Sequence, residues 1–318
     1  MSPSVPRRRS SFLISLLLVS CSIVLTANPG WQKNVTSDDD EGPAKTDPAL
    51  KSLLAKAGAY AVGYRKLCRE LVAEERMTQK EYDRKGRLKN QRSFISDYLF
   101  VALPSDPELT VEFRDVVSID GKPVPRQNQG LLELFRNKSS NAFEEARRVT
   151  KESTKYNLGR DRTSNMVNFC LSFLLPPFQR VIEYQSLPAE NSAEGDHLIV
   201  QFRELTDETA LRAVTPLGRK PIPSQGRIWL SKPDAKVLKI DFTFKKDEEW
   251  YSTAGRYLSE YQLGVDNLLL PYRFEEYFYD VKHPERVLFE SVATYSNFRH
   301  FSVDVRIVPD DSSIDPSQ

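Results

Sequence analysis

Residues 226–244 have the sequence Gly226-Arg-Ile-Trp-Leu-Ser-Lys-Pro-Asp-Ala-Lys-Val-Leu-Lys-Ile-Asp-Phe-Thr-Phe244, in which two apolar runs flank the turn Ser231-Lys-Pro-Asp234. Proline and aspartate are typical of turns, so this stretch predicts a strand, a turn and a second strand. In the second strand, apolar residues share one face and polar residues share the other: Leu238, Ile240, Phe242 and Phe244 against Lys239, Asp241 and Thr243. One buried face and one solvated face are typical of a strand in an antiparallel sheet.

The same alternation continues through most of the second half of the chain. From about Asn165 the pattern is that of strands, which include the apolar run Phe169–Leu175 and continue to Val305. Short turns between these runs predict an antiparallel meander of about five or six strands. Pro271 lies inside one of them, which indicates either an edge strand or a bent strand.

The first half of the chain adds helices to this sheet. Asp47 can cap a helix that begins at Pro48, and apolar residues at three- and four-residue spacing extend it to Leu71, over about 25 residues. A second helix is predicted from the capping residues at 139–141 to Tyr156. The predicted strands between the two helices are Val72–Tyr82, Phe94–Leu103 and Val111–Ile119. We therefore predict an α+β fold in which a curved antiparallel sheet, a half-barrel, carries two main helices on its concave face.

The N-terminal residues 1–27 have the pattern of a secretory signal peptide. Three arginines at positions 7–9 precede an apolar run over residues 12–27, which is short for a membrane-spanning helix. Cleavage after Ala27 is one interpretation, and lipidation of Cys21 in the lipobox-like phrase Leu-Val-Ser-Cys21 is the other. In both cases we expect an exported protein, periplasmic or associated with the outer membrane, that contacts a membrane only through an N-terminal lipid anchor.

A linker, one domain and a tail are predicted after the signal peptide. Residues 28–47 contain proline, glycine, serine and an acidic run, which is typical of a disordered linker. Residues 48–308 are long enough for a single folded domain. The tail at residues 309–318 is rich in aspartate and serine, and we expect it to be disordered.

Composition and charge exclude several classes of function. The 318 residues contain 45 Lys and Arg against 44 Asp and Glu, whereas a nucleic-acid-binding domain normally has a basic excess. Three cysteines and three histidines exclude a disulfide scaffold and leave little for a metal site, so we expect no metal. No cofactor-binding or catalytic motif is present, and we expect no cofactor. Cys68 and Cys170 remain after processing, either as one disulfide or as two separately buried thiols.

Aromatic residues are concentrated in the last third of the chain. Tyrosine has an apolar body and a polar tip, which suits the wall of a half-open barrel that binds an apolar ligand. The candidate ligand-binding residues are Tyr257, Tyr261, Tyr272, Phe274, Tyr295 and Phe301. The alternative is an ordinary core beneath the helices, which also needs aromatic side chains.

Three phrases of the sequence carry a family resemblance: Gly226–Ile240, Asn267–Tyr277 and Ala293–Phe301. The first resembles the recurrent strand–turn–strand unit of the LolA/LolB-type lipoprotein carriers and the RseB-like regulatory domains. The other two are similar to secreted proteins of environmental bacteria such as acidobacteria. The resemblance covers most of residues 48–305 by architecture, and it implies a half-open antiparallel barrel with helices on its concave side. It implies no particular functional residue.

Three functional hypotheses follow from these observations. The first is a non-enzymatic exported envelope protein that binds a lipid or a lipoprotein acyl chain in the half-barrel. The second is a closed-barrel envelope scaffold or stress sensor that binds a partner protein. The third is a hydrolase in which two of four carboxylates converge in a cleft, the four being Glu75, Asp97, Asp115 and Glu152.

Overall fold

The structure is a computed structural model that describes residues 47–103, 106–124, 142–158, 167–188, 197–205, 208–215, 218–232, 234–248 and 251–300. The predicted signal peptide with Cys21, the linker before Asp47 and the tail at 309–318 lie outside these residues. Among the described helices, none combines the length and the apolar character that crossing a membrane requires.

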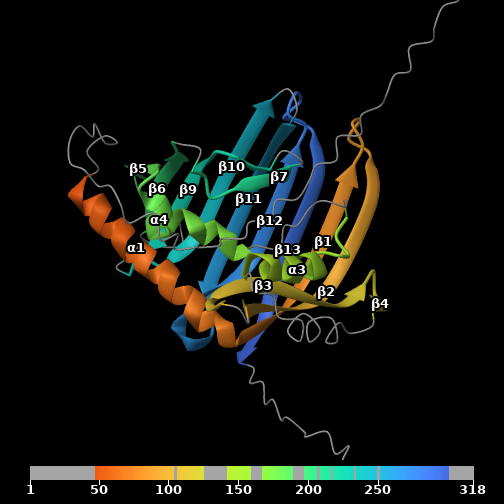
Figure 1. Cartoon of the computed structure of the whole chain (residues 1–318), viewed down its shortest axis with the longest axis horizontal. Coiled ribbons are helices and arrows are strands. Elements are labelled where there is room, and N and C mark those ends of the chain that lie inside the picture. Colours follow the sequence, from red (N-terminus) through yellow and green to blue (C-terminus); the bar gives the residue numbers. More distant parts are fainter. Residues whose placement is uncertain are drawn as a thin grey trace, which may run out of the picture.

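One large antiparallel sheet dominates the described part of the chain (Figure 1). Its 11 strands lie in the order β4-β3-β2-β1-β13-β12-β11-β10-β9-β6-β5, and it does not close into a barrel. The strands are β1 (Leu71–Tyr82), β2 (Leu88–Leu103), β3 (Asp106–Ile119), β4 (Lys122–Pro123), β5 (Ile182–Leu187), β6 (His197–Glu204), β9 (Ser224–Ser231), β10 (Val237–Glu248), β11 (Tyr251–Leu263), β12 (Leu269–Tyr279) and β13 (Val287–His300). A separate two-stranded hairpin contains β7 (Arg212–Thr215) and β8 (Gly218–Pro221).

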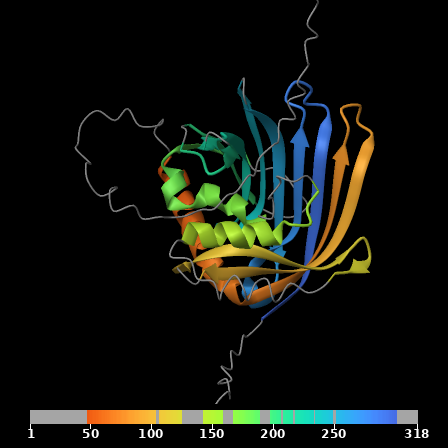
Figure 2. The same cartoon turned by 45° about the vertical axis from the view of Figure 1, so that its right-hand side comes forward.

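Figure 2 shows most of the helices grouped on one side of the curved sheet. They are α1 (Pro48–Leu67), η2 (Cys68–Glu70), α3 (Ala142–Ser153), η3 (Val167–Leu174) and α4 (Pro176–Gln179), and the short η4 (Val265–Asn267) connects β11 to β12. We call the face of β1, β6 and β9–β13 that carries the main core the inner face, and the opposite face the outer face.

Several predicted elements are confirmed. Asp47 caps α1, because its carboxylate accepts a hydrogen bond from the backbone amide of Ala49 at 3.1 Å. The meander is present as β9 to β13, in which each strand pairs with the next along the chain. The first helix is shorter than predicted, because η2 tightens its end and Leu71 already begins β1.

The prediction of a strand at Phe169–Leu175 is wrong. Most of this run forms η3, an eight-residue 3₁₀ helix in which every residue is buried. A short run that is apolar on all sides has no helical or strand periodicity, so the pattern alone does not distinguish the two.

Pro271 lies in β12, a central strand between β11 and β13, and not in an edge strand. The register between β11 and β12 shifts between Glu260 and Tyr261, next to the pair Tyr261 and Pro271. A bulge is the position at which a central strand tolerates proline, so the bent-strand alternative is the correct one.

The predicted placement of two helices on the concave face is not confirmed. α1 packs against η3 and α4, and η3 is the segment that contacts β10, β11 and β12. α3 packs against β2 and β3 instead, where its Ala146 and Val149 form a second small core with Val101, Leu103 and Phe113.

At Gly226 the backbone of β9 lies in close contact with that of β10. A methyl group on Gly226 would overlap the carbonyl oxygen of Asp241 and the Cβ of Phe242. We therefore expect Gly226→Ala to lower the free energy of unfolding by about 1–3 kcal/mol, the usual cost of overpacking. Urea unfolding followed by circular dichroism measures the change.

Gly63 on α1 provides the matched control, because a Cβ built there meets nothing within 4 Å. Gly63→Ala should raise the free energy of unfolding by about 0.5–1 kcal/mol, since alanine is favoured over glycine in a helix. Equal effects of the two substitutions would contradict the close approach at Gly226.

Candidate functional site

The predicted ligand-binding aromatics lie in the core and do not line an open cavity. Tyr257, Tyr261, Phe274 and Tyr295 are only 2–5% exposed. Tyr272 is half-buried, and Phe301 lies outside the described residues. Strand alternation therefore places four of the six residues on the inner face, where they are covered by other parts of the chain.

The main cover is η3, which we call the plug (residues Val167–Leu174). The rings of Phe173 and Phe202 lie 4.4 Å apart between centroids, and those of Phe173 and Phe242 lie 4.8 Å apart. The ring of Phe169 also contacts that of Phe242, and Tyr257 extends the aromatic cluster along the sheet. The plug thus occupies the position on the aromatic wall where the sequence predicts an apolar ligand.

Side chains of the sheet bind the start of the plug. The hydroxyls of Ser259 and Tyr261 both donate to the carbonyl oxygen of Val167, at 2.8 and 3.1 Å. Ser259 Oγ also lies 3.1 Å from Cys170 Sγ. Asn168 donates from its backbone amide to Glu112 at 3.2 Å and from its side chain to the Tyr98 hydroxyl at 3.0 Å. These hydrogen bonds satisfy most of the buried polar groups, and Oδ1 of Asn168 is left without a partner among the described residues.

The end of the plug is anchored in the same way. Tyr184 donates its hydroxyl to the carbonyl oxygen of Phe173. Gln179 of α4 donates from its amide to the carbonyl oxygens of Leu174, at 2.6 Å, and Leu54 of α1, at 2.9 Å. A single glutamine therefore ties the plug to α1.

A buried ion pair lies near the plug, between β1 and β3. Glu75 and Arg114 are 0% and 2% exposed, and the Arg114 Nη2 to Glu75 Oε1 distance is 2.8 Å, with a second contact from Nε. Burial lowers the pKa of Arg114, but the adjacent Glu75 carboxylate raises it above its ordinary value. The Arg114 amide donates to Ser153 Oγ at 2.9 Å, which joins this pair to the end of α3.

Arg114 points to the interior and is buried, whereas the next residue of β3, Asp115, is half-buried. A bulge between β2 and β3, near Ser96 and Val116, changes which residues share a face. Two of the four carboxylates of the hydrolase hypothesis, Asp97 and Asp115, are register partners on β2 and β3, while Glu75 is buried with Arg114 and Glu152 lies on α3. Three of them have different ion-pair partners: Glu75 with Arg114, Asp97 with Arg299 and Glu152 with Lys155.

The two described cysteines are free and buried. Burial raises the pKa of each thiol to about 12, so neither is a thiolate at neutral pH. Of the two alternatives at Cys68 and Cys170, the structure has separate buried thiols.

A second buried carboxylate, Glu204, fixes the chain at the end of β6. It accepts hydrogen bonds from the backbone amides of Ala210 at 2.6 Å and Ser224 at 2.8 Å. Burial raises the pKa of Glu204 to about 7, although these hydrogen bonds oppose the shift.

Sequence reasoning missed the plug and its polar anchors. The available signal was the position of a mostly apolar run directly before Pro176 and Pro177, which favours a helix start there over a continuing strand. Ser259, Tyr184 and Gln179 carried no local signal, because their partners lie far away in the sequence.

Comparisons with known proteins find no matching family model and no matching curated protein. Among solved structures, the chain is similar to a DUF1329 family protein from Desulfovibrio piger, with 14% identity over 80% of this chain and 94% of that chain and a TM-score of 0.35. It is also similar to a LolA superfamily protein from Nitrosomonas europaea, with 12% identity, the same coverage and a TM-score of 0.30. Both TM-scores are low, so neither similarity supports a statement about the function of this chain.

The buried ion pair yields a prediction about stability. Glu75→Leu or Arg114→Met alone should lower the free energy of unfolding by about 3–5 kcal/mol, because each leaves an uncompensated buried charge. The double variant should lose less than the sum, since neither charge remains. Urea unfolding of the four proteins measures the coupling, and additive losses would show that the two charges do not stabilise each other.

Glu204 yields a prediction about pH. Its folded pKa of about 7 lies above the usual value of glutamate, so the folded state binds this proton more tightly than the unfolded state. The contribution of Glu204 to stability is therefore present at low pH and is lost as pH rises through about 7.

Glu204→Gln removes this titration. From pH 8 to pH 5, we expect the unfolding free energy of wild type to rise relative to Glu204→Gln, on the order of 2–3 kcal/mol. Urea unfolding of both proteins at several pH values measures the difference, and parallel pH profiles would contradict the assignment.

Proposed function

We propose that this protein is a non-enzymatic, exported envelope protein that binds an apolar chain, such as a lipid or a lipoprotein acyl chain, in place of the plug. The observation that carries the proposal is the plug itself. A buried, mostly apolar segment lies on an aromatic wall through side-chain contacts and a few hydrogen bonds, as a bound ligand does. The predicted signal peptide supports export, and lipidation of Cys21 stays a prediction.

The local structure of the plug favours its exchange. Runs of 3₁₀ helix longer than about four residues are uncommon because their hydrogen bonds are poorly aligned. The plug extends over eight residues. It contributes no strand to the sheet, so its removal would leave all the backbone pairing of β10, β11 and β12 in place.

The plug and an acyl chain gain similar free energies when they are buried on the inner face. The five Val, Leu and Phe side chains of the plug contribute about 8–15 kcal/mol on burial, at about 1.5–3 kcal/mol each. An acyl chain with about 14 methylenes gains about 11 kcal/mol, at about 0.8 kcal/mol for each buried methylene. Replacement of one by the other is therefore close to neutral, and the binding of a ligand can shift the population.

The second candidate is the envelope scaffold that binds a partner protein. The dense packing of the plug among the described residues favours it, because a permanent plug makes the inner face an ordinary core. The two functions differ in one property, which is whether the plug leaves the sheet.

A disulfide that fixes the plug to β11 tests this property. Ser259→Cys places a thiol beside Cys170, where the present Oγ to Sγ distance of 3.1 Å is about 1 Å longer than an S–S bond. We expect the oxidised variant to bind palmitate at least tenfold less than wild type and to recover after reduction. Native mass spectrometry of the delipidated protein, incubated with palmitate, counts the adducts.

Ser259→Cys combined with Cys170→Ser is the matched control, because it has the same new thiol and no partner for it. Tyr261→Phe removes one anchor of the plug and should increase binding. Undiminished palmitate binding by the oxidised variant, or no binding by wild type, would contradict the proposal and favour the scaffold.

A further inference from the structure

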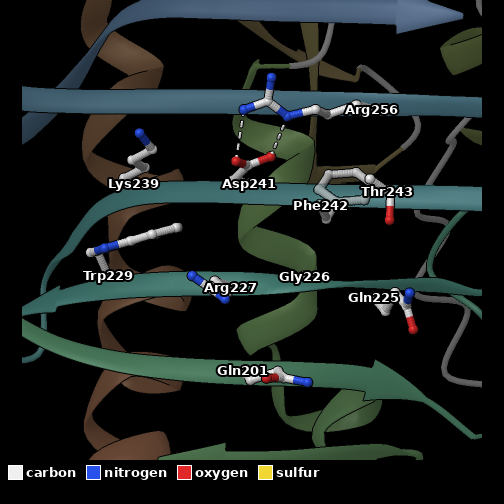
Figure 3. Close-up of a pocket in the computed structure, with 10 residues that line it drawn as sticks. All are labelled: Gln201, Gln225, Gly226, Arg227, Trp229, Lys239, Asp241, Phe242, Thr243 and Arg256. Atoms are coloured by element: carbon white, nitrogen blue, oxygen red, sulfur yellow. Dashed lines mark hydrogen bonds and ion pairs between the residues drawn. The ribbon is translucent and has the colours of Figure 1, made fainter. Parts of the chain in front are cut away.

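The outer face carries a groove that neither the sequence prediction nor the proposed function uses. It has a volume of about 480 Å³, within the range of roughly 300–1,000 Å³ that is common for small-molecule sites. It crosses β6, β9, β10 and β11, and Figure 3 shows side chains of these strands around the Asp241–Arg256 pair. Its lining includes Gln201, Trp229, Lys239, Asp241 and Arg256.

Trp229 supplies an aromatic platform in this groove. Its neighbours Ile228 and Leu230 are fully buried on the inner face, so alternation places the half-buried indole on the outer face. The Lys239 ammonium lies 5.3 Å from the centre of the indole ring. A half-buried tryptophan on the outer face is not needed for the main core, and it presents a planar apolar surface beside polar groups.

Three cations, Arg227, Lys239 and Arg256, line the groove together with the carboxylate Asp241, and two of the cations form ion pairs. Arg256 binds both carboxylate oxygens of Asp241, through Nε and Nη2, at 2.8 Å each. Lys239 Nζ lies 3.3 Å from Glu260 on β11. These pairs hold donors and acceptors in fixed positions, and their charges nearly cancel.

This chemistry favours one class of ligand. An acyl chain needs an apolar lining, whereas charged and amide groups surround Trp229. A nucleic acid or another polyanion needs an excess of cations, and the pairs at Asp241 and Glu260 remove most of it here. A neutral polyhydroxyl chain needs an aromatic platform and oriented hydrogen-bonding groups, and both are present.

The length of the polar surface agrees with a chain and not with a single small molecule. From Gln201 on β6 to Arg256 on β11 there are three strand spacings, or roughly 14 Å. On the next strand, Tyr277 is the register partner of Arg256, and its ring stacks with that of Tyr279 at 6.4 Å and 12°. A second aromatic platform therefore continues the surface beyond the ion pair.

We propose that the outer face of β6 and β9–β12 binds a glycan, a chain of neutral or N-acetylated sugars, with Trp229 and Tyr277 as stacking platforms. Peptidoglycan and secreted polysaccharides share this chemistry. The site does not depend on the plug, which lies on the other side of the sheet.

Co-sedimentation of the full chain with insoluble glycans tests the proposal. The probes are peptidoglycan sacculi, chitin and cellulose. We expect wild type to sediment with at least one of them, and Trp229→Ala to reduce the bound fraction at least tenfold at equal glycan concentration. Binding to sacculi alone identifies peptidoglycan, and binding to chitin or cellulose as well identifies general sugar stacking; both outcomes support the site.

Arg203→Ala is the matched control, because Arg203 lies on β6, is exposed and pairs with Glu183 outside the groove. It should bind as wild type does. If Trp229→Ala does not fold, Tyr277→Ala and Gln201→Ala test the same surface. Each should lower binding several-fold in a protein with unchanged circular dichroism.

Two results would overturn the proposal: no sedimentation of wild type with any glycan, or equal sedimentation of wild type and folded Trp229→Ala. The oxidised Ser259→Cys variant should still bind glycan. Failure of the glycan site is therefore distinguishable from failure of the proposed apolar binding.

Discussion

A curved sheet that does not close must cover its apolar inner face with other parts of its own chain, and the plug is the cover in this protein. The aromatic wall around Phe242 and Tyr257 would otherwise meet water. α1 does not cover this wall alone: its Tyr64 contacts Tyr261 directly, and the rest of the cover is the plug, which contacts β10, β11 and β12. Backbone groups on a buried 3₁₀ segment need partners, which explains why polar side chains such as Ser259 and Tyr261 point inward from strands that are otherwise apolar there.

The same requirement accounts for the polar groups at the β1–β3 end of the core. Tyr98 and Asn168 link the start of the plug to Glu112, and the Glu75–Arg114 pair lies nearby and reaches α3 through Ser153. Apolar contacts alone tolerate small shifts of one element over another, whereas a buried bidentate pair is satisfied in one arrangement. The network therefore fixes where α3 and the plug sit on β1–β3, at a cost in desolvation that a larger apolar core would avoid.

The features that could be predicted from the sequence are those with a local signal. Asp47 and Pro48 mark the start of α1, and strict alternation identifies β10 and its neighbours. The plug was missed because a short, mostly apolar run has no clear periodicity. The burial of Arg114 was missed because both faces of β3 are covered: Phe113 packs against α3, while Arg114 and Val116 face the main core. Four of the six candidate aromatics lie on the inner face, but the pattern does not reveal whether a ligand or the chain itself covers that face. The outer groove depends on β6 lying next to β9, a pairing across the β7–β8 hairpin that no local pattern encodes.

β10 shows how one strand serves both proposed sites. Its even-numbered residues Phe242 and Phe244 support the plug, and its odd-numbered residues Lys239 and Asp241 line the outer groove. Because successive side chains point to opposite faces, a substitution on one face leaves the contacts of the other face largely intact. Apolar burial is insensitive to salt and sequence detail, whereas oriented hydrogen bonds discriminate between ligands. If both proposals hold, the inner face binds an acyl chain through apolar burial, and the outer face selects a glycan through oriented hydrogen bonds.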